Sequence, residues 1–216
     1  MLELLKSGEP FLFANIIVSL VALSITFQRT HALWFKFGRS VEDLLKDIFA
    51  QVEAGSFARA LQLTNSTDHP INSVLKAALL RANRPEKEIR RAVEVAAIAE
   101  MPRLKRGTGY MPQLSNIATL FGLIGTIRGL IISFGGMSGG DPATRQAMLS
   151  EGISIAFYNT YVGLTVAVLI IIAYMMILGK QNKLMASMEL GSAKLMDQLL
   201  MQQSITKEKG AAKKPA

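Results

Sequence analysis

Three stretches of the chain are almost wholly apolar, and the charged residues are confined to the segments between them. Residues 10–28 and 152–179 carry no charged side chain, and residues 111–140 carry only Arg128. An α-helix needs about 20 apolar residues to cross the hydrocarbon core of a bilayer, so each stretch is long enough to span a membrane. The pattern predicts an all-α membrane protein with transmembrane helices over 10–28, 111–135 and 151–179.

The polar segment 29–110 repeats apolar positions at helical spacing and predicts a helical domain. The expected helices cover 40–55, 56–64, 70–82 and 85–106. Ser40 caps the first and Gly55 closes it, while Pro102 kinks or breaks the last. These hairpins are too small for a catalytic domain and are expected to pack against copies of themselves. The basic, low-complexity residues 207–216 are expected to be disordered.

The distribution of basic residues predicts the topology. The chain has 24 Lys and Arg against 16 Asp and Glu, a net charge of +8. Most of the basic residues lie in 29–110 and 180–216, which places these segments in the cytoplasm. Residues 1–9 and the loop 136–150 are then periplasmic. A cleaved signal peptide is the alternative for the first span, but Glu3 and Glu9 precede it and no cleavage site follows.

Composition excludes several classes of site. The chain has no cysteine, which excludes disulfides and thiolate metal sites, and its two histidines lie outside the apolar spans. No metal and no cofactor are expected. The basic excess fits an anionic lipid surface rather than nucleic acid, because no aromatic residues interleave with it. Residues 136–140 match G-x-S-x-G, but no strand precedes them and no base can reach Ser138, so we expect no enzyme.

Small and hydroxyl side chains form one stripe along each of the last two spans. The first stripe contains Ser115, Ala118, Thr119, Gly122, Gly125, Thr126, Gly129 and Ser133, and the second contains Ala156, Thr160, Gly163 and Ala167, with Asn159 on its flank. Such stripes permit close helix packing in lipid, which is one interpretation. The other is a lined ion passage. Neither stripe holds a carboxylate or histidine, so a proton-titrating group would have to come from another chain.

Two runs carry a family resemblance: LFGLIGTIRGLIISF (Leu120–Phe134) and GISIAFYNTYVGLTVAV (Gly152–Val168). With the upstream segments Glu53–Thr64 and Ala99–Leu120, they resemble the ExbB/TolQ/MotA proton-channel family. The resemblance implies a homopentamer in the bacterial inner membrane whose last two spans surround a pore. A dimeric, single-span partner of the ExbD/TolR/MotB type would supply an aspartate inside that pore.

The resemblance also implies roles for individual residues. Thr126 and Thr160 match the family's two pore threonines and would face the partner's aspartate. The remaining residues expected to line the pore or the partner interface are Gly122, Gly125, Gly129, Ser133, Ala156, Asn159, Gly163 and Ala167. The implied function is a stator subunit that couples proton-motive force to mechanical work on an envelope process, either TonB/Tol-like transport or gliding-type motility. A non-conducting membrane scaffold is the alternative.

Three positions depart from the family pattern. ExbB and TolQ have a glutamate where Ile155 stands, a proline where Leu169 stands and a tryptophan where Arg128 stands. These departures indicate a divergent member. Arg128 either reaches the membrane surface or a neighbouring carbonyl, or lies near the pore mouth and lowers the pKa of the partner's aspartate. The choice between H⁺ and Na⁺ stays open.

Overall fold

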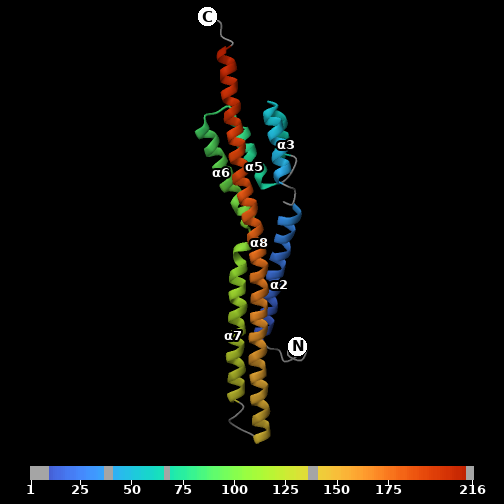
Figure 1. The fold of residues 1–216 in the computed structure, drawn as a ribbon. Helices are drawn as coiled ribbons and strands as arrows, with labels where there is room; N and C mark the ends of the chain where they lie inside the picture. Colours follow the sequence, from blue (N-terminus) through green and yellow to red (C-terminus); the bar gives the residue numbers. More distant parts are fainter. Residues whose placement is uncertain (1–9, 37–40, 66–68, 136–140, 213–216) are drawn as a thin grey trace. The chain divides into compact units, whose positions relative to one another are not determined.

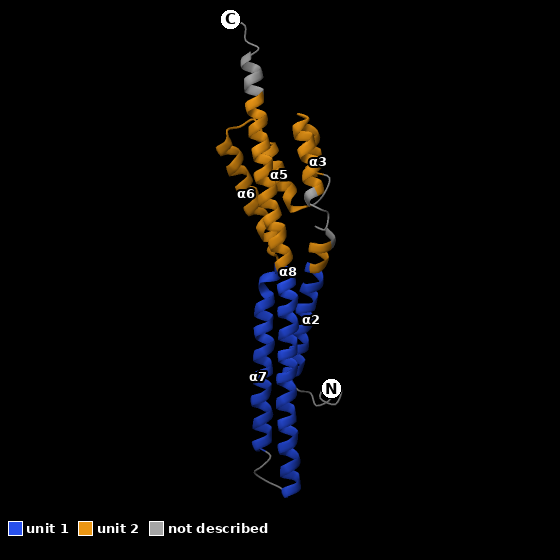
Figure 2. Cartoon of the chain, in the orientation of Figure 1, with its two compact units in different colours: residues 1–29, 107–178 blue, residues 30–106, 179–216 orange. Residues whose placement is uncertain are grey.

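The computed structural model describes residues 10–36, 41–65, 69–135 and 141–212, and the described chain is almost entirely helical (Figure 1). Its elements are α2 (Pro10–Thr30), η1 (His31–Lys36), α3 (Val41–Glu53), α4 (Phe57–Asn65), α5 (Pro70–Leu79), α6 (Glu86–Lys105), η2 (Thr108–Tyr110), α7 (Met111–Gly135) and α8 (Pro142–Ala212). They form two compact units, Met1–Arg29 with Gly107–Leu178 and Thr30–Arg106 with Gly179–Ala216 (Figure 2). We call them the membrane unit and the polar unit.

Three helices are long and apolar enough to cross a membrane: Pro10–Trp34, Thr108–Gly135 and Pro142–Ile205. The prediction of an all-α protein with three membrane-spanning helices is confirmed. The third helix differs from the prediction because it does not end near residue 179. α8 continues without interruption to Ala212, since Gly179 is an isolated glycine and the residues after it are good helix formers.

Helix α2 contributes one buried stripe to the membrane unit. Its buried residues Leu12, Asn15, Val18 and Ala22 recur every three or four positions, while most of the remaining apolar side chains are exposed. Figure 1 shows α2, α7 and the first part of α8 side by side. Asn15 is fully buried, and neither atom of its side-chain amide has a hydrogen-bond partner among the described residues. The other α2 faces are suited to contact lipid.

The polar unit combines α3–α6 with the polar part of α8. Its apolar core contains Ile48, Val52, Ala60, Ile71, Val74, Leu75, Ala78, Ile89, Leu195 and Leu199. Glutamines of α8 bind carbonyl groups at the ends of the other helices. Gln181 Nε2 donates to Leu104 O at 2.7 Å, and Gln203 Nε2 donates to Arg84 O at 3.0 Å. These bonds satisfy carbonyls that have no partner inside their own helix or turn.

The short helices follow the predicted order with small shifts of their ends. Gly55 closes α3 with a φ of 71°, as predicted, and Ser56 N donates to Gln51 O at 2.9 Å. The predicted cap Ser40 lies outside the described residues. Pro102 does not break α6, which continues to Lys105. Residues 207–212, expected to be disordered, belong to α8, because lysine, glutamate and alanine are strong helix formers.

Candidate functional site

Helices α7 and α8 pack antiparallel along their small-residue stripes. Every buried residue of α7 lies on the α8 side, and the set is Met111, Ser115, Ala118, Gly122, Gly125, Gly129 and Ser133. The facing residues of α8 include Gly152, Ala156, Asn159, Gly163 and Ala167, all buried. The spacing of three and four residues on both helices keeps a single seam in contact over the length of the span.

Glycines bring the two backbones unusually close. A Cβ added to Gly163 would lie 2.7 Å from Ala118 O and 2.8 Å from Gly122 Cα. A Cβ added to Gly129 would lie 2.6 Å from Ala156 N. No real side chain tolerates such distances, so the glycines are required for this approach. In lipid, where apolar burial drives nothing, van der Waals packing at short range stabilises helix pairs of this kind.

Polar groups at the seam bind backbone carbonyls. Ser115 Oγ donates to Ala167 O at 3.0 Å across the two helices, and Ser133 Oγ donates to Leu149 O at 3.2 Å. Asn159 Nδ2 donates to Ile155 O within α8 at 3.0 Å. Its Oδ1 atom is buried beside Gly125 and has no hydrogen-bond partner among the described residues. The seam is therefore polar at several depths yet closed to solvent.

Thr126 and Thr160 lie on one edge of the α7–α8 pair. Both side chains are half-buried. Each lies about 60° around its helix axis from the centre of the contact stripe, turned in the direction in which the chain winds from its amino to its carboxyl end. Because the two helices are antiparallel and face each other, equal turns in this direction place both side chains on the same side of the pair. Both lie at the same depth, because Gly125 contacts Asn159 and Gly122 contacts Thr160 Cα. We call this side the threonine edge.

The threonine hydroxyls donate their protons to their own helices. Thr126 Oγ1 donates to Leu123 O at 2.5 Å, and Thr160 Oγ1 donates to Ala156 O at 3.3 Å. Such bonds are common for threonine in membrane helices and are compatible with a purely structural role. They also leave the oxygen lone pairs available as acceptors, so the threonine edge can accept a proton-bearing group or solvate a cation.

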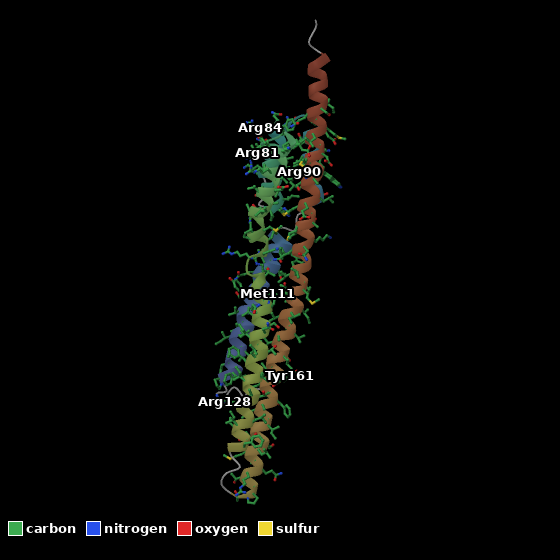
Figure 3. The ribbon with its side chains drawn as sticks, turned by 90° about the vertical axis from the view of Figure 1, so that its left-hand side faces the viewer. Arg81, Arg84, Arg90, Met111, Arg128 and Tyr161 are labelled. Atoms are coloured by element: carbon green, nitrogen blue, oxygen red, sulfur yellow. The ribbon has the colours of Figure 1, made fainter. Side chains whose placement is uncertain are left out.

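Arg128 and Ile155 lie on the opposite edge of the pair. Around their helix axes, Arg128 lies about 100° and Ile155 about 80° from the centre of the contact stripe, in the sense opposite to that of the threonines. Both side chains therefore project away from the threonine edge. Ile155 is buried, whereas Arg128 is half-buried and interacts within its own chain. Figure 3 shows Arg128 on the side of α2. The prediction that Arg128 stands beside the stripe rather than on it agrees with this position.

The structure therefore separates the predicted site residues into three groups: those in the seam, Thr126 and Thr160 on one edge, and Arg128 on the opposite edge. Eight of them are buried in the seam: Gly122, Gly125, Gly129, Ser133, Ala156, Asn159, Gly163 and Ala167. In one chain their surfaces are occupied by the facing helix, as the helix-packing interpretation expects. A passage can adjoin them only along an edge of the pair, where Thr126 and Thr160 lie.

The described residues offer little other chemistry. No group of three or more His, Asp or Glu side chains capable of holding a metal ion is found among them. The G-x-S-x-G segment 136–140 lies outside the described residues. At the start of α8, a hydrogen bond from Thr144 lowers the pKa of Asp141. Gln181, Gln203 and Asn15 were not predicted, and no sequence signal distinguishes the two glutamines from surface amides.

Comparison with known proteins identifies the class. The model of the MotA/TolQ/ExbB proton channel family matches residues 66–190, more than half of the chain. The chain belongs to this family, whose members are channel and motor subunits rather than enzymes. The family and the three apolar helices together make it a multi-pass inner-membrane protein.

Individual relatives agree with this class. An ExbB-like biopolymer transport protein of Synechocystis is 32% identical over 154 residues, covering 69% of this chain and 71% of that protein. An ExbB homolog of Methanothermobacter thermautotrophicus is 26% identical over 180 residues, 83% of this chain but only 63% of that protein. TolQ of Pseudomonas aeruginosa is 24% identical over 187 residues, covering 79% of this chain and 80% of that protein.

Proposed function

We propose that this chain is the channel-forming stator subunit of a membrane motor and that its threonine edge lines the ion pathway. The observation that carries the proposal is the meeting of Thr126 and Thr160 at one depth on one half-exposed edge. Both carry a hydroxyl group deep within a membrane-length helix. A polar edge at this depth is costly against lipid and is typical of an ion route.

The chemistry of the edge requires a partner. Thr126 and Thr160 do not titrate, and no carboxylate or histidine lies in the apolar part of α7 or between residues 152 and 179 of α8. A single-span partner helix of the ExbD/TolR/MotB type would bring an aspartate to the threonine edge. When protonated, that carboxyl donates a hydrogen bond to the threonine oxygen, whose own proton is already bound to a helix carbonyl. Release of the proton breaks this bond and frees the partner to move.

Several copies of the chain are needed to enclose such a partner. By analogy with the family we propose a pentamer around a partner dimer, with residues 1–9 and 136–150 in the periplasm and 29–110 and 180–216 in the cytoplasm. One proton crossing a potential of 100 mV releases about 2.3 kcal/mol. That energy would drive mechanical work on an envelope process. The ExbB-like biopolymer transport relative suggests transport, and a gliding-type process is the alternative.

One observation favours a second function. The second function is a non-conducting membrane scaffold. The seam residues pack α7 against α8 within one chain, and a scaffold needs this packing as much as a channel does. The two functions differ at the threonine edge, because an ion pathway requires the hydroxyl oxygens of Thr126 and Thr160 as acceptors and a scaffold does not.

Proton flux separates the two functions. The chain is purified with its partner from the native host, reconstituted in liposomes holding a pH-sensitive dye, and energised with a potassium diffusion potential. Thr160→Val and Thr126→Val keep the side-chain shape and should reduce proton uptake at least tenfold with the complex intact. Leu123→Val, exposed on the same turn as Thr126, is the matched control and should conduct normally. Equal flux in all variants refutes the threonine pathway.

A further inference from the structure

An open groove runs between α6 and the polar part of α8, which lie side by side in the polar unit (Figure 1). Its volume is about 360 Å³, which is large enough to take side chains of a binding partner. The lining residues recur every three or four positions on both helices, so the groove follows the helix axes. Its apolar lining comprises Val93, Ala97, Ile98 and Met101 of α6 and Ala193 and Met196 of α8.

The apolar lining is open to water in the single chain. The side chain of Ile98 is 68% exposed, and Met101 and Met196 are half-buried on opposite walls. Methionine side chains are flexible and polarizable, and they are frequent on surfaces that bind peptides of varied sequence. A continuous apolar strip with a polar rim is typical of an interaction site. The groove is therefore suited to bind apolar side chains of another polypeptide.

The rim of the groove is acidic. Each wall contributes one exposed carboxylate, Glu94 from α6 and Glu189 from α8. Neither carboxylate forms an ion pair with a described residue. Arg90 also lines the groove, but its guanidinium is bound to Glu86 Oε1 at 3.2 Å. A segment that carries Lys or Arg beside apolar side chains complements this combination of charge and apolar surface.

The single-span partner of the proposed function should have such a segment. Because the partner acts on the envelope, its larger part lies in the periplasm and a short flank lies in the cytoplasm. Cytoplasmic flanks of membrane spans carry an excess of Lys and Arg. Glu189 lies ten residues, or about 15 Å along α8, beyond Gly179, where the uncharged stretch ends. An extended chain covers this distance along the helix axis in about five residues.

We propose that the groove between α6 and α8 binds the basic cytoplasmic flank of the single-span partner. Apolar side chains of the flank contact Met101 and Met196, and its Lys or Arg side chains lie between Glu94 and Glu189. The inference rests on the proposed function, from which it takes the partner, and it adds a contact outside the membrane. This contact keeps the partner attached while release of the proton from its aspartate frees its membrane helix to move.

Site-specific photo-crosslinking in the native host tests the contact. The photoreactive amino acid p-benzoylphenylalanine replaces Ile98 or, as the matched control, Val95. The two side chains are 68% and 61% exposed on the same helix, but Val95 lines the neighbouring groove between α5 and α6. Irradiation should join position 98 to the partner that copurifies with the chain, with at least fivefold less product from position 95. Mass spectrometry should place the crosslink in the Lys- and Arg-rich segment next to the partner's membrane span.

Charge reversal tests the acidic rim. Glu94→Lys and Glu189→Lys should each lower the yield of the product from position 98 at least fivefold, because they repel a basic flank. Glu88→Lys is the matched control, since it makes the same change of charge on α6 but in the groove between α5 and α6. All three glutamates are exposed, so the variants should fold normally. Equal yields from all three variants would refute the role of the rim.

Other results would overturn the inference. A product that joins two copies of this chain through position 98 would mean that copies cover the groove. No product from position 98, or equal products from positions 95 and 98, would mean that the partner does not bind there. The proposed function fails separately: normal proton flux in Thr126→Val and Thr160→Val, with the crosslink present, would contradict the threonine pathway but leave this contact standing. Impaired flux in those variants without the crosslink would contradict this inference alone.

Discussion

Replacing Gly125 by alanine should separate the two helices of the seam. The added Cβ would lie 2.5 Å from Asn159 Cγ and 2.9 Å from Oδ1, and closer still to Asn159 Cβ. The clash involves the stem of the side chain, so a change of rotamer cannot relieve it. Overpacking of this kind costs about 1–3 kcal/mol. The higher helix propensity of alanine offsets about 0.5–1 kcal/mol, which leaves a loss on the order of 1–2 kcal/mol.

The partner substitution turns this into a test of the contact itself. Asn159→Gly removes the Cβ that Gly125→Ala would strike, so the double variant should be more stable than the sum of the single effects predicts. Coupling between residues in direct contact is typically about 0.5–3 kcal/mol. Gly179→Ala is the matched control, since a Cβ there meets nothing within 4 Å.

The assay is reversible unfolding in mixed micelles, with increasing SDS and far-UV circular dichroism as the signal. Gly125→Ala should lower the midpoint, Gly179→Ala should not, and Asn159→Gly should rescue part of the loss. Equal stability of Gly125→Ala and Gly179→Ala, or strict additivity of the double variant, would refute the packing of α7 on α8 described above.

Three further predictions use the same chain. Ser115→Ala removes the bond to Ala167 O and should cost about 0.6 kcal/mol in the SDS titration, whereas the exposed Ser154→Ala should cost nothing in monomeric protein. Gly55→Ala forces an alanine to a φ of 71° and should lower the free energy of unfolding by about 1–2 kcal/mol. Gly109→Ala, where φ is not positive, is the control. Equal effects of the two substitutions would contradict the role of Gly55 in ending α3. The bond from Thr144 lowers the pKa of Asp141 below its ordinary value of 3.8, so its stabilising effect is complete above that value and is lost as the pH falls through the lowered pKa. Thr144→Val should raise that pKa in a carbon-13 NMR titration, and an unchanged value would contradict this cause.

The three spans were predictable because a bilayer imposes one strong rule on sequence, a long apolar run free of charge. Residues 10–28, 111–135 and 151–179 follow that rule, and the structure places membrane-length helices over each. The end of the third helix was not predictable by the same rule. Charge marks where a helix leaves the membrane, not where it stops, and α8 continues to Ala212.

The sequence also did not show which residues of the small-residue stripes face the other helix and which lie on the edge of the helix pair. Periodicity places Gly122, Gly125 and Thr126 within one third of the circumference, and it does not tell which of them face a helix of the same chain. The structure divides them by about 60° of rotation, glycines into the seam and threonines onto its edge. The hydrogen bonds of Gln181 and Gln203 could not be predicted either, because the carbonyl groups that they bind are distant in sequence.

Water access to the threonine edge tests the central claim most directly. Thr126→Cys and Thr160→Cys are introduced singly and treated in native membranes with a small cationic methanethiosulfonate, which reacts only with hydrated thiols. Both positions should react at least tenfold faster than Ile127→Cys and Tyr161→Cys, which are exposed on other faces of α7 and α8 at similar depth. Threonine-edge thiols no more reactive than these two controls would contradict an ion pathway along this edge.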